Sequence, residues 1–328
     1  MTIIKNVFSC VLSNRSERLS IAARRASVGW PTTLLLLLWP LVSLSAGRLT
    51  LEGPLVQGGL VEGRVQAGAT LTFEGRAVRV SEDGVFLIGF GRNSPPKVSL
   101  AVTFADGSKQ TRTLKIKQRK YQIQRIDGLP SKMVTPSEKD LERIYGEIAQ
   151  IKKTRSRDDA RTDFLTGFIW PTVGRISGVY GSQRILNGEP RQPHFGVDVA
   201  VPTGTPVLAP ADGIVSLAHS DMYYTGGTLV LDHGHGLSSS YFHLSRILVK
   251  QSQRVRQGDV IAEVGATGRV TGAHLHWSLN LFERPLDPQL LMKSKFARVV
   301  PSSPEVTASS HADDNEATGG AEPVGISR

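Results

Sequence analysis

Residues 272–280 read GAHLHWSLN, and this stretch indicates how the C-terminal half of the chain folds. After His276 the residues alternate in the manner of a β-strand. Side chains of a strand point to opposite faces in turn, so His274 and His276 lie on the same face. Two neighbouring imidazoles can bind one metal ion together, or one can bind it while the other handles protons. The stretch therefore predicts a rigid strand at a metal site.

The rest of the mature chain also has the pattern of β-structure. Between Phe164 and Leu291, short β-favouring runs are separated by Gly, Asp and Pro turns, which predicts an antiparallel β domain with little helix. In residues 48–128, Asp-Gly and Glu-Gly pairs stand between β-favouring runs and predict hairpins of a small β-sandwich or barrel-like module. These pairs are Glu74-Gly75, Asp83-Gly84 and Asp106-Gly107. The predicted fold class is mostly β: a C-terminal antiparallel β-sheet or sandwich with a small N-terminal all-β domain.

A helical connector is predicted for residues 129–158. Thr135 fits the N-cap, Pro136 the first helical position, and Glu138 completes a capping box. Four apolar side chains then recur at helical spacing and predict one apolar face of a helix. They are Leu141, Ile144, Tyr145 and Ile148.

The two ends of the chain differ in composition from its body. Residues 1–47 combine a basic stretch with an apolar run, Leu34 to Leu44, and small residues up to Ala46, which is the layout of a secretory signal or an uncleaved anchor. We expect cleavage near Ala46 and an address in the periplasm or cell envelope. The tail, residues 297–328, is polar and acidic and is predicted to be disordered. The domain boundaries are therefore 1–47, 48–128, 129–158, 159–296 and 297–328.

Charge and cysteine content limit the chemistry. The formal net charge is +10, so the protein is drawn toward polyanions, either nucleic acid or an anionic envelope polymer. No zinc-finger spacing or RNA-binding signature is present, and with a secretory leader we expect no nucleic acid partner. The single cysteine, Cys10, lies in the leader. A transition-metal site must therefore use His, Asp or Glu.

Histidines gather in the C-terminal β domain. Seven of the eight lie between positions 194 and 276, in the stretches HFGVD, LAHSD, LDHGHG, SYFHLS and HLHW. His233 and His235 of LDHGHG are flanked by glycine and suggest a turn with poorly fixed rings, so we interpret them as structural. Rigidly held ligands make better metal sites, which favours the HLHW pair.

The ordered motifs HFGVD, SYFHLS and HLHW resemble the M23 zinc metallopeptidases, the lysostaphin-like or LytM family. The resemblance covers about residues 164 to 291 and includes GTPVLAPADGIV and RVRQGDVIAEVGATG. It implies that His194, Asp198 and His276 are zinc ligands, with a water in the fourth position. It also implies that His243 and His274 are the catalytic histidines. All five positions hold the expected residue types.

The resemblance implies a zinc-dependent endopeptidase that hydrolyses peptide cross-links of bacterial peptidoglycan, with the zinc-bound water as nucleophile and a histidine as general base. The residue types agree with this chemistry, because two imidazoles, one carboxylate and an open position suit a catalytic zinc. A non-catalytic activator of a cell-wall amidase is the alternative. The N-terminal β domain has no histidine or cysteine, which suits a contact with an envelope protein partner.

Overall fold

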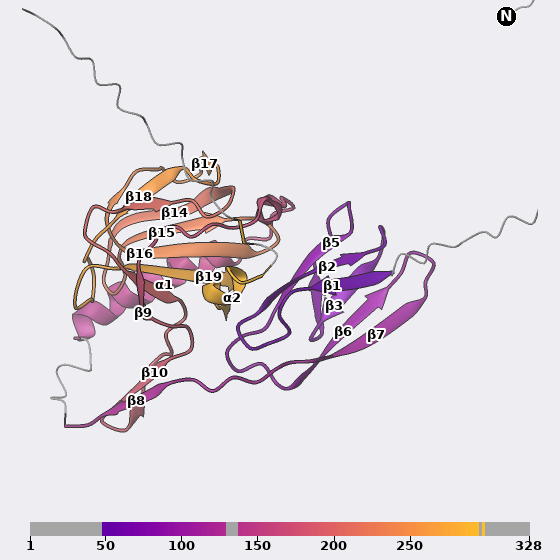
Figure 1. Ribbon diagram of the computed structural model, residues 1–328, viewed down its shortest axis with the longest axis horizontal. Helices are drawn as coiled ribbons and strands as arrows, with labels where there is room; N and C mark the ends of the chain where they lie inside the picture. Colours follow the sequence, from indigo (N-terminus) through magenta and orange to yellow (C-terminus); the bar gives the residue numbers. More distant parts are fainter. Residues whose placement is uncertain (1–47, 129–136, 295–296, 299–328) are drawn as a thin grey trace, which may run out of the picture. The chain divides into compact units, whose positions relative to one another are not determined.

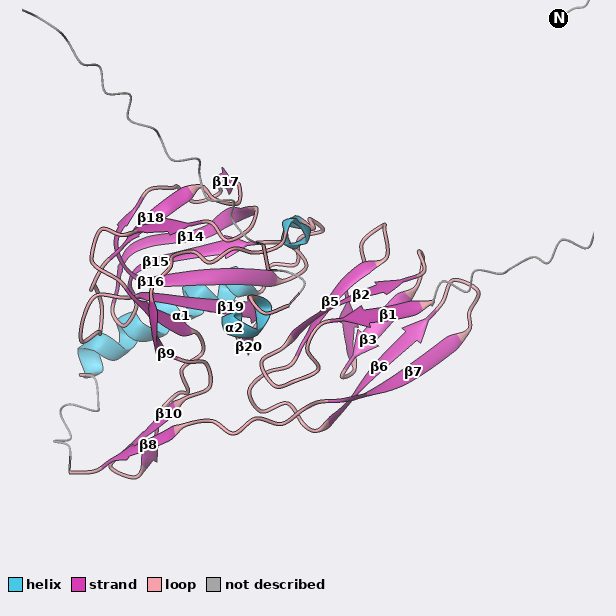
Figure 2. Ribbon diagram, in the orientation of Figure 1, coloured by secondary structure: helices cyan, strands magenta, loops and turns pink. Residues whose placement is uncertain are grey.

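The computed structural model describes residues 48–128, 137–294 and 297–298, and antiparallel strands dominate it (Figures 1 and 2). The predicted mostly-β fold class is confirmed. The predicted leader, and the predicted tail apart from residues 297–298, lie outside the described residues. Within the described ranges, no helix has the length and apolar character needed to cross a membrane.

Residues 49–115 form two sheets around one apolar core, as a small β-sandwich. One sheet has the order β1-β2-β5 and the other β4-β3-β6-β7. Phe86 and Leu100 are fully buried between them. The strands are β1 Leu49–Glu52, β2 Leu60–Val65, β3 Thr70–Phe73, β4 Arg76–Val78, β5 Val85–Gly89, β6 Lys97–Thr103 and β7 Lys109–Lys115.

Two of the three predicted hairpin turns are confirmed. Glu74-Gly75 joins the paired strands β3 and β4 with φ of 50° and 78°, and Asp106-Gly107 joins β6 and β7. The Asp83-Gly84 hairpin is wrong. This turn leads from β4 in one sheet to β5 in the other, because β5 pairs with β2.

Among the described strands, one parallel pair occurs, and it lies in a short ribbon. β8 (Ile123–Ile126) runs parallel to β10 (Gln183–Leu186), which pairs with β11 (Glu189–Pro190). β8 follows the sandwich in sequence, whereas β10 and β11 come shortly before the HFGVD motif (Figure 1).

The C-terminal half is built on a ten-stranded sheet with the order β17-β14-β15-β16-β19-β12-β9 and with β13, β18 and β20 beside this path. Its core face is apolar and includes the fully buried Tyr241 and Trp277. The strands are β9 Arg175–Gly178, β12 Val197–Ala200, β13 Pro206–Leu208, β14 Gly213–Met222, β15 Gly226–Asp232, β16 Leu237–Ile247, β17 Arg254–Val255, β18 Val260–Val264, β19 Leu275–Leu281 and β20 Arg284–Leu286.

Helix α1 (Glu138–Arg155) corrects two details of the predicted connector. Its N-cap is Ser137, whose hydroxyl accepts a hydrogen bond from the Asp140 N–H; Thr135 and Pro136 lie outside the described residues. The predicted apolar face is only partly buried, because Tyr145 is 65% and Ile148 52% exposed. The helix packs on the sheet through a narrower stripe that holds Ile144 and Ile151. The remaining helices are a 3-10 turn, Asp163–Thr166, and α2, Pro288–Leu291.

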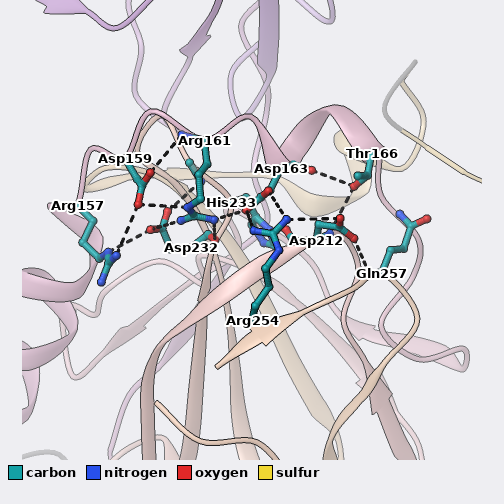
Figure 3. Close-up of polar contacts among 11 residues, drawn as sticks. Arg157, Asp159, Arg161, Asp163, Thr166, Asp212, Asp232, His233, Arg254 and Gln257 are labelled. Atoms are coloured by element: carbon teal, nitrogen blue, oxygen red, sulfur yellow. Dashed lines mark hydrogen bonds and ion pairs between the residues drawn. The ribbon is translucent and has the colours of Figure 1, made fainter. Parts of the chain in front are cut away.

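A buried ion-pair network ties the segment after α1 to the sheet (Figure 3). Asp232 at the end of β15 accepts hydrogen bonds from Arg157 Nε at 3.1 Å and from Arg161 Nη2 at 2.8 Å. Asp163 accepts hydrogen bonds from Arg161 and, at 2.8 Å, from Arg254 Nη2. Both carboxylates are buried, so the arginines that surround them supply the hydrogen bonds that water would otherwise supply.

Replacing Asp232 by alanine will lower the free energy of unfolding by about 3–5 kcal/mol, because Arg157 and Arg161 lose their shared buried partner. Urea denaturation measures this change. Asp221→Ala is the matched control, since the Asp221 side chain is 74% exposed in its pair with Arg143. Equal losses in the two variants would show that the buried network adds no stability.

Candidate metal centre

Three adjacent strands bring three metal-ligand residues together. Asp198 on β12 lies opposite His276 on β19 in the ladder, and Phe242 on β16 lies opposite His276 on its other side. His194 precedes β12 by three residues and turns its ring back onto Asp198. The period-two alternation that buries Val197 and Val199 in the core places Asp198 on the opposite face.

The ligand atoms converge on one point. His194 Nε2 lies 2.9 Å from Asp198 Oδ1, His276 Nδ1 lies 2.9 Å from the same oxygen, and the two nitrogens are 3.0 Å apart. These three residues form a group whose ligand atoms could together hold a metal ion. The structure therefore brings together all three residues that the sequence analysis predicted as metal ligands.

The hydrogen bonds around His194 orient its ring in the way that a metal-binding histidine needs. Its Nδ1 lies 3.1 Å from the Val179 carbonyl oxygen, which can only accept, so Nδ1 carries the hydrogen. Burial lowers the pKa of the His194 ring, but the hydrogen bond to Asp198 outweighs burial and raises it, so without a metal Nε2–H can donate to Asp198. In the neutral ring Nε2 offers a lone pair instead. A proton or a metal ion must lie among these three ligand atoms, and a backbone carbonyl that fixes the ring is the usual support of a metal-bound histidine. The donor set of two imidazoles and one carboxylate fits zinc.

Electrostatics keep the carboxylate charged. Burial opposes ionisation of Asp198, but the hydrogen bonds of His194 and His276 outweigh burial and hold the pKa of the carboxyl far below its usual range. For His276, burial is the largest effect and lowers the pKa of the ring. A charged oxygen beside a neutral imidazole is the protonation state that metal binding needs.

Two glycines leave the space that the ligands occupy. A Cβ on Gly178 of β9 would lie 2.1 Å from Asp198 Oδ2, and a Cβ on Gly196 would lie 2.6 Å from His276 Nε2. His276 is also stacked on Phe242, with ring centroids 5.0 Å apart and planes 7° apart. The sequence analysis did not single out Gly178, Gly196 or Phe242. Gly196 stands inside HFGVD and Phe242 inside SYFHLS, so their place within the motifs was the available signal.

The two predicted catalytic histidines stand beside the centre. His274 Nε2 is 3.8 Å from Asp198 Oδ1, and the His243 and His274 ring centroids are 4.9 Å apart. Each ring donates its Nδ1–H to a backbone carbonyl, that of Thr267 for His243 at 3.0 Å and that of Gly272 for His274 at 2.9 Å. Both rings therefore leave Nε2 as an available acceptor when neutral. Burial lowers the pKa of His243 to about 4, so this ring is neutral at pH 7.

The LDHGHG histidines lie elsewhere, and one expectation about them is wrong. His233 is fully buried and its ring is well fixed: Nδ1 donates to the Asp212 carbonyl at 2.7 Å, and Nε2 lies 2.7 Å from Ser239 Oγ. Ser239 Oγ in turn lies 2.6 Å from the Tyr241 hydroxyl. The predicted structural role agrees with this geometry, but for His233 the predicted loose ring does not.

Comparison with known proteins identifies the domain. Residues 192–288, which contain Asp198 and the four histidines of the site, match the model of Peptidase family M23. The chain carries a Peptidase family M23 domain. The structure also resembles the crystal structure of a protein described as a peptidase M23 from Pseudomonas aeruginosa, with a TM-score of 0.56 and 29% identity, over 74% of this chain and 96% of that one.

Two relatives from Vibrio cholerae match over the same domain. A stretch of 114 residues, 34% of this chain, is 42% identical to peptidoglycan DD-endopeptidase ShyA. A stretch of 95 residues, 29% of this chain, is 44% identical to peptidoglycan DD-endopeptidase ShyB. The match spans 26% of ShyA and 22% of ShyB, so it relates the M23 domain and not the whole proteins.

Gly178→Ala will weaken zinc binding by the M23 domain by at least about tenfold, because the added methyl group displaces the Asp198 carboxylate. Competition with a calibrated zinc chelator measures the affinity. Gly272→Ala is the matched control, since a Cβ there meets no atom within 4 Å. Unchanged affinity in the Gly178 variant would show that Asp198 is not held against β9 as described.

Acid will destabilise the domain partly through His233. Burial lowers the pKa of this ring from its ordinary 6.5 in the folded protein, whereas the unfolded chain binds the proton normally. The contribution of neutral His233 to the free energy of unfolding is therefore complete above pH 6.5 and is lost as the pH falls below that value. The difference in unfolding free energy between about pH 7.5 and about pH 5.5, from urea titrations, will be smaller in His233→Asn than in the parent protein. Equal differences would contradict this assignment.

Proposed function

We propose that the protein is a zinc-dependent endopeptidase that hydrolyses peptide cross-links of bacterial peptidoglycan. The observation that carries the proposal is the convergence of His194, Asp198 and His276 next to two histidines with available acceptor nitrogens. These are the parts that metal-assisted peptide hydrolysis needs: a Lewis acid site and a proton acceptor beside it.

His194, Asp198 and His276 would hold the ion. Zinc bound there supplies a Lewis acid that lowers the pKa of a water molecule and polarises a carbonyl group. The three side chains are fixed before any ion binds, by the Val179 carbonyl, by the β12–β19 ladder and by the Phe242 ring. Such preorganisation keeps the ligand geometry constant through the reaction.

His243 and His274 move protons. A ring with Nδ1–H bound to a backbone carbonyl accepts a proton at Nε2, and the same atom then returns the proton to the leaving amine. The left-handed backbone of His243, φ 65°, is fixed by the bond from its own N–H to the Thr225 carbonyl at 2.7 Å. Because the two rings adjoin, the second can donate a hydrogen bond to the substrate oxygen once it is protonated.

The substrate class is supported by two observations. ShyA and ShyB, similar over the M23 domain, are peptidoglycan DD-endopeptidases by name. The chain is also basic, with a net charge of +10, which favours contact with an anionic wall polymer. We propose a D-alanyl–diaminopimelate cross-link as the bond that is cut. We also propose export to the periplasm or cell envelope, because the substrate is found there and residues 1–47 have the pattern of a secretory signal.

Alanine substitutions distinguish a histidine that binds zinc from a histidine that accepts a proton. The protein from Gly47 onward will bind about one zinc per chain and release soluble muropeptides from purified Gram-negative sacculi. His276→Ala will lose both zinc and cleavage. His243→Ala will keep zinc and lose about 10²–10⁴-fold in rate, because only proton transfer is removed. Metal analysis and chromatography of the digest are the two measurements.

His219→Ala is the control for loss of an imidazole, since His219 lies in β14 away from the converging ligand atoms. Zinc binding without cleavage of any sacculus would leave the amidase-activator alternative in place of the enzyme. A parent protein that retains no zinc would contradict the proposal as a whole.

A further inference from the structure

An arginine-rich hairpin stands directly beside the metal centre. Backbone hydrogen bonds join it to the first ligand: Gly181 N–H donates to the His194 carbonyl at 2.7 Å, and His194 N–H donates to the Ser182 carbonyl at 2.8 Å. Arg184 on β10 follows two residues later, and the Arg191 N–H donates to the Arg184 carbonyl at 2.8 Å. Two arginines are thus held on a short ribbon whose base is the metal-binding segment.

The positive charges of this ribbon are not neutralised by carboxylates. Among the described residues, no ion pair joins Arg184, Arg191 or the β8 residue Arg125 to an acid, and Glu189 in the same hairpin pairs with none of them. Arg92 is half-buried against the ribbon, and its guanidinium donates to the Gly181 carbonyl at 2.9 Å and to Gln183 Oε1 at 3.3 Å, both neutral. Three other arginines differ, because Arg119, Arg161 and Arg254 all contact carboxylates.

Two buried donors at this place have no partner. The Tyr121 hydroxyl and Arg191 Nε are shielded from solvent and make no hydrogen bond within the described chain. Tyr121 lies under the Arg92 guanidinium, 4.5 Å from ring centroid to Cζ, and against Gly181, where a Cβ would come within 2.1 Å of the ring. Burial raises the pKa of the Tyr121 phenol, so its O–H stays a donor at neutral pH. An unpartnered buried donor is unfavourable, so a carboxylate that draws the Arg191 guanidinium outward relieves its Nε.

We propose that Arg184 and Arg191 form a subsite that binds a free carboxylate of the substrate peptide beside the metal centre. Guanidinium groups match carboxylates in charge and in planar geometry. The subsite selects acidic peptide stems over stems whose carboxylates are masked. This inference rests on the proposed peptidoglycan endopeptidase function and adds the chemical group that the enzyme recognises.

The test compares two probes: a soluble cross-linked muropeptide dimer with free carboxylates and the same dimer after chemical amidation. The zinc-loaded parent protein will favour the carboxylate form by about tenfold in kcat/KM, through KM rather than kcat. Arg184→Gln combined with Arg191→Gln will remove this preference. Arg184→Lys combined with Arg191→Lys, which keeps the charge, will restore part of it.

The matched control is Lys250→Gln combined with Arg256→Gln, which removes the same charge near β17, at the opposite edge of the sheet from β9. The control will keep the preference. Unfolding midpoints and zinc content will be equal in all variants, so a folding defect is distinguished from lost recognition. A parent protein that treats both probes alike, or a control that loses as much as the double variant, overturns the subsite.

Binding by metal-free protein separates this inference from the proposed function. Calorimetric titration of the metal-free parent with each dimer will show tighter binding of the carboxylate form, and this difference will vanish in Arg184→Gln with Arg191→Gln. If the zinc-loaded parent cuts neither dimer but the metal-free protein still discriminates between them, the endopeptidase proposal fails and the subsite stands. Equal binding of the two dimers overturns the subsite whatever the activity.

Discussion

Three electron-rich atoms, two imidazole nitrogens and one carboxylate oxygen, lie within 3.0 Å of one another in the M23 domain, and the surrounding structure is built to hold them there. Such a triangle is stable only with a proton or a metal ion among its atoms, so its position must be enforced by the fold. The strand ladder sets Asp198 opposite His276, and the Val179 carbonyl sets the ring of His194. Gly178 and Gly196 leave the room in which this arrangement fits.

Rigidity comes from polar contacts in the core as well as from apolar packing. The hydrogen-bonded chain His233–Ser239–Tyr241 crosses the buried face of β16, whose opposite face carries Phe242 beside the metal ligands. Asp163 and Asp232 fasten the segment that follows α1 to the same sheet. Fully satisfied buried polar groups specify a single arrangement, and a metal site needs a single arrangement.

Much of the site could be predicted from the sequence, because strand periodicity and motif order are local properties. HLHW places two imidazoles on one face by alternation alone, and the family resemblance adds His194, Asp198 and His243. Register could not be predicted: nothing in the sequence states that Asp198 pairs with His276, or that β8 runs parallel to β10. These pairings depend on packing between segments that are far apart in the chain.

The errors have the same origin. The α1 periodicity indicated a wide apolar face, but the sheet offers it only the small cluster around Leu217 and Val230, so Tyr145 and Ile148 stay exposed. Asp83-Gly84 has hairpin chemistry, yet its flanking strands belong to different sheets. His233 precedes a glycine, yet a carbonyl and a hydroxyl from neighbouring segments fix its ring. In each case local sequence gave the conformation and a distant partner decided the contact.

The most direct test of this account is X-ray absorption spectroscopy at the zinc edge of the zinc-loaded protein from Gly47 onward. The account predicts one zinc per chain in a shell of nitrogen and oxygen atoms at about 2.0–2.1 Å, with outer-shell scattering from two imidazole rings. The imidazole signal will fall to one ring or disappear in His276→Ala. A shell with no imidazole scattering, or zinc that does not stay bound, would contradict the assignment of His194, Asp198 and His276 as the metal centre.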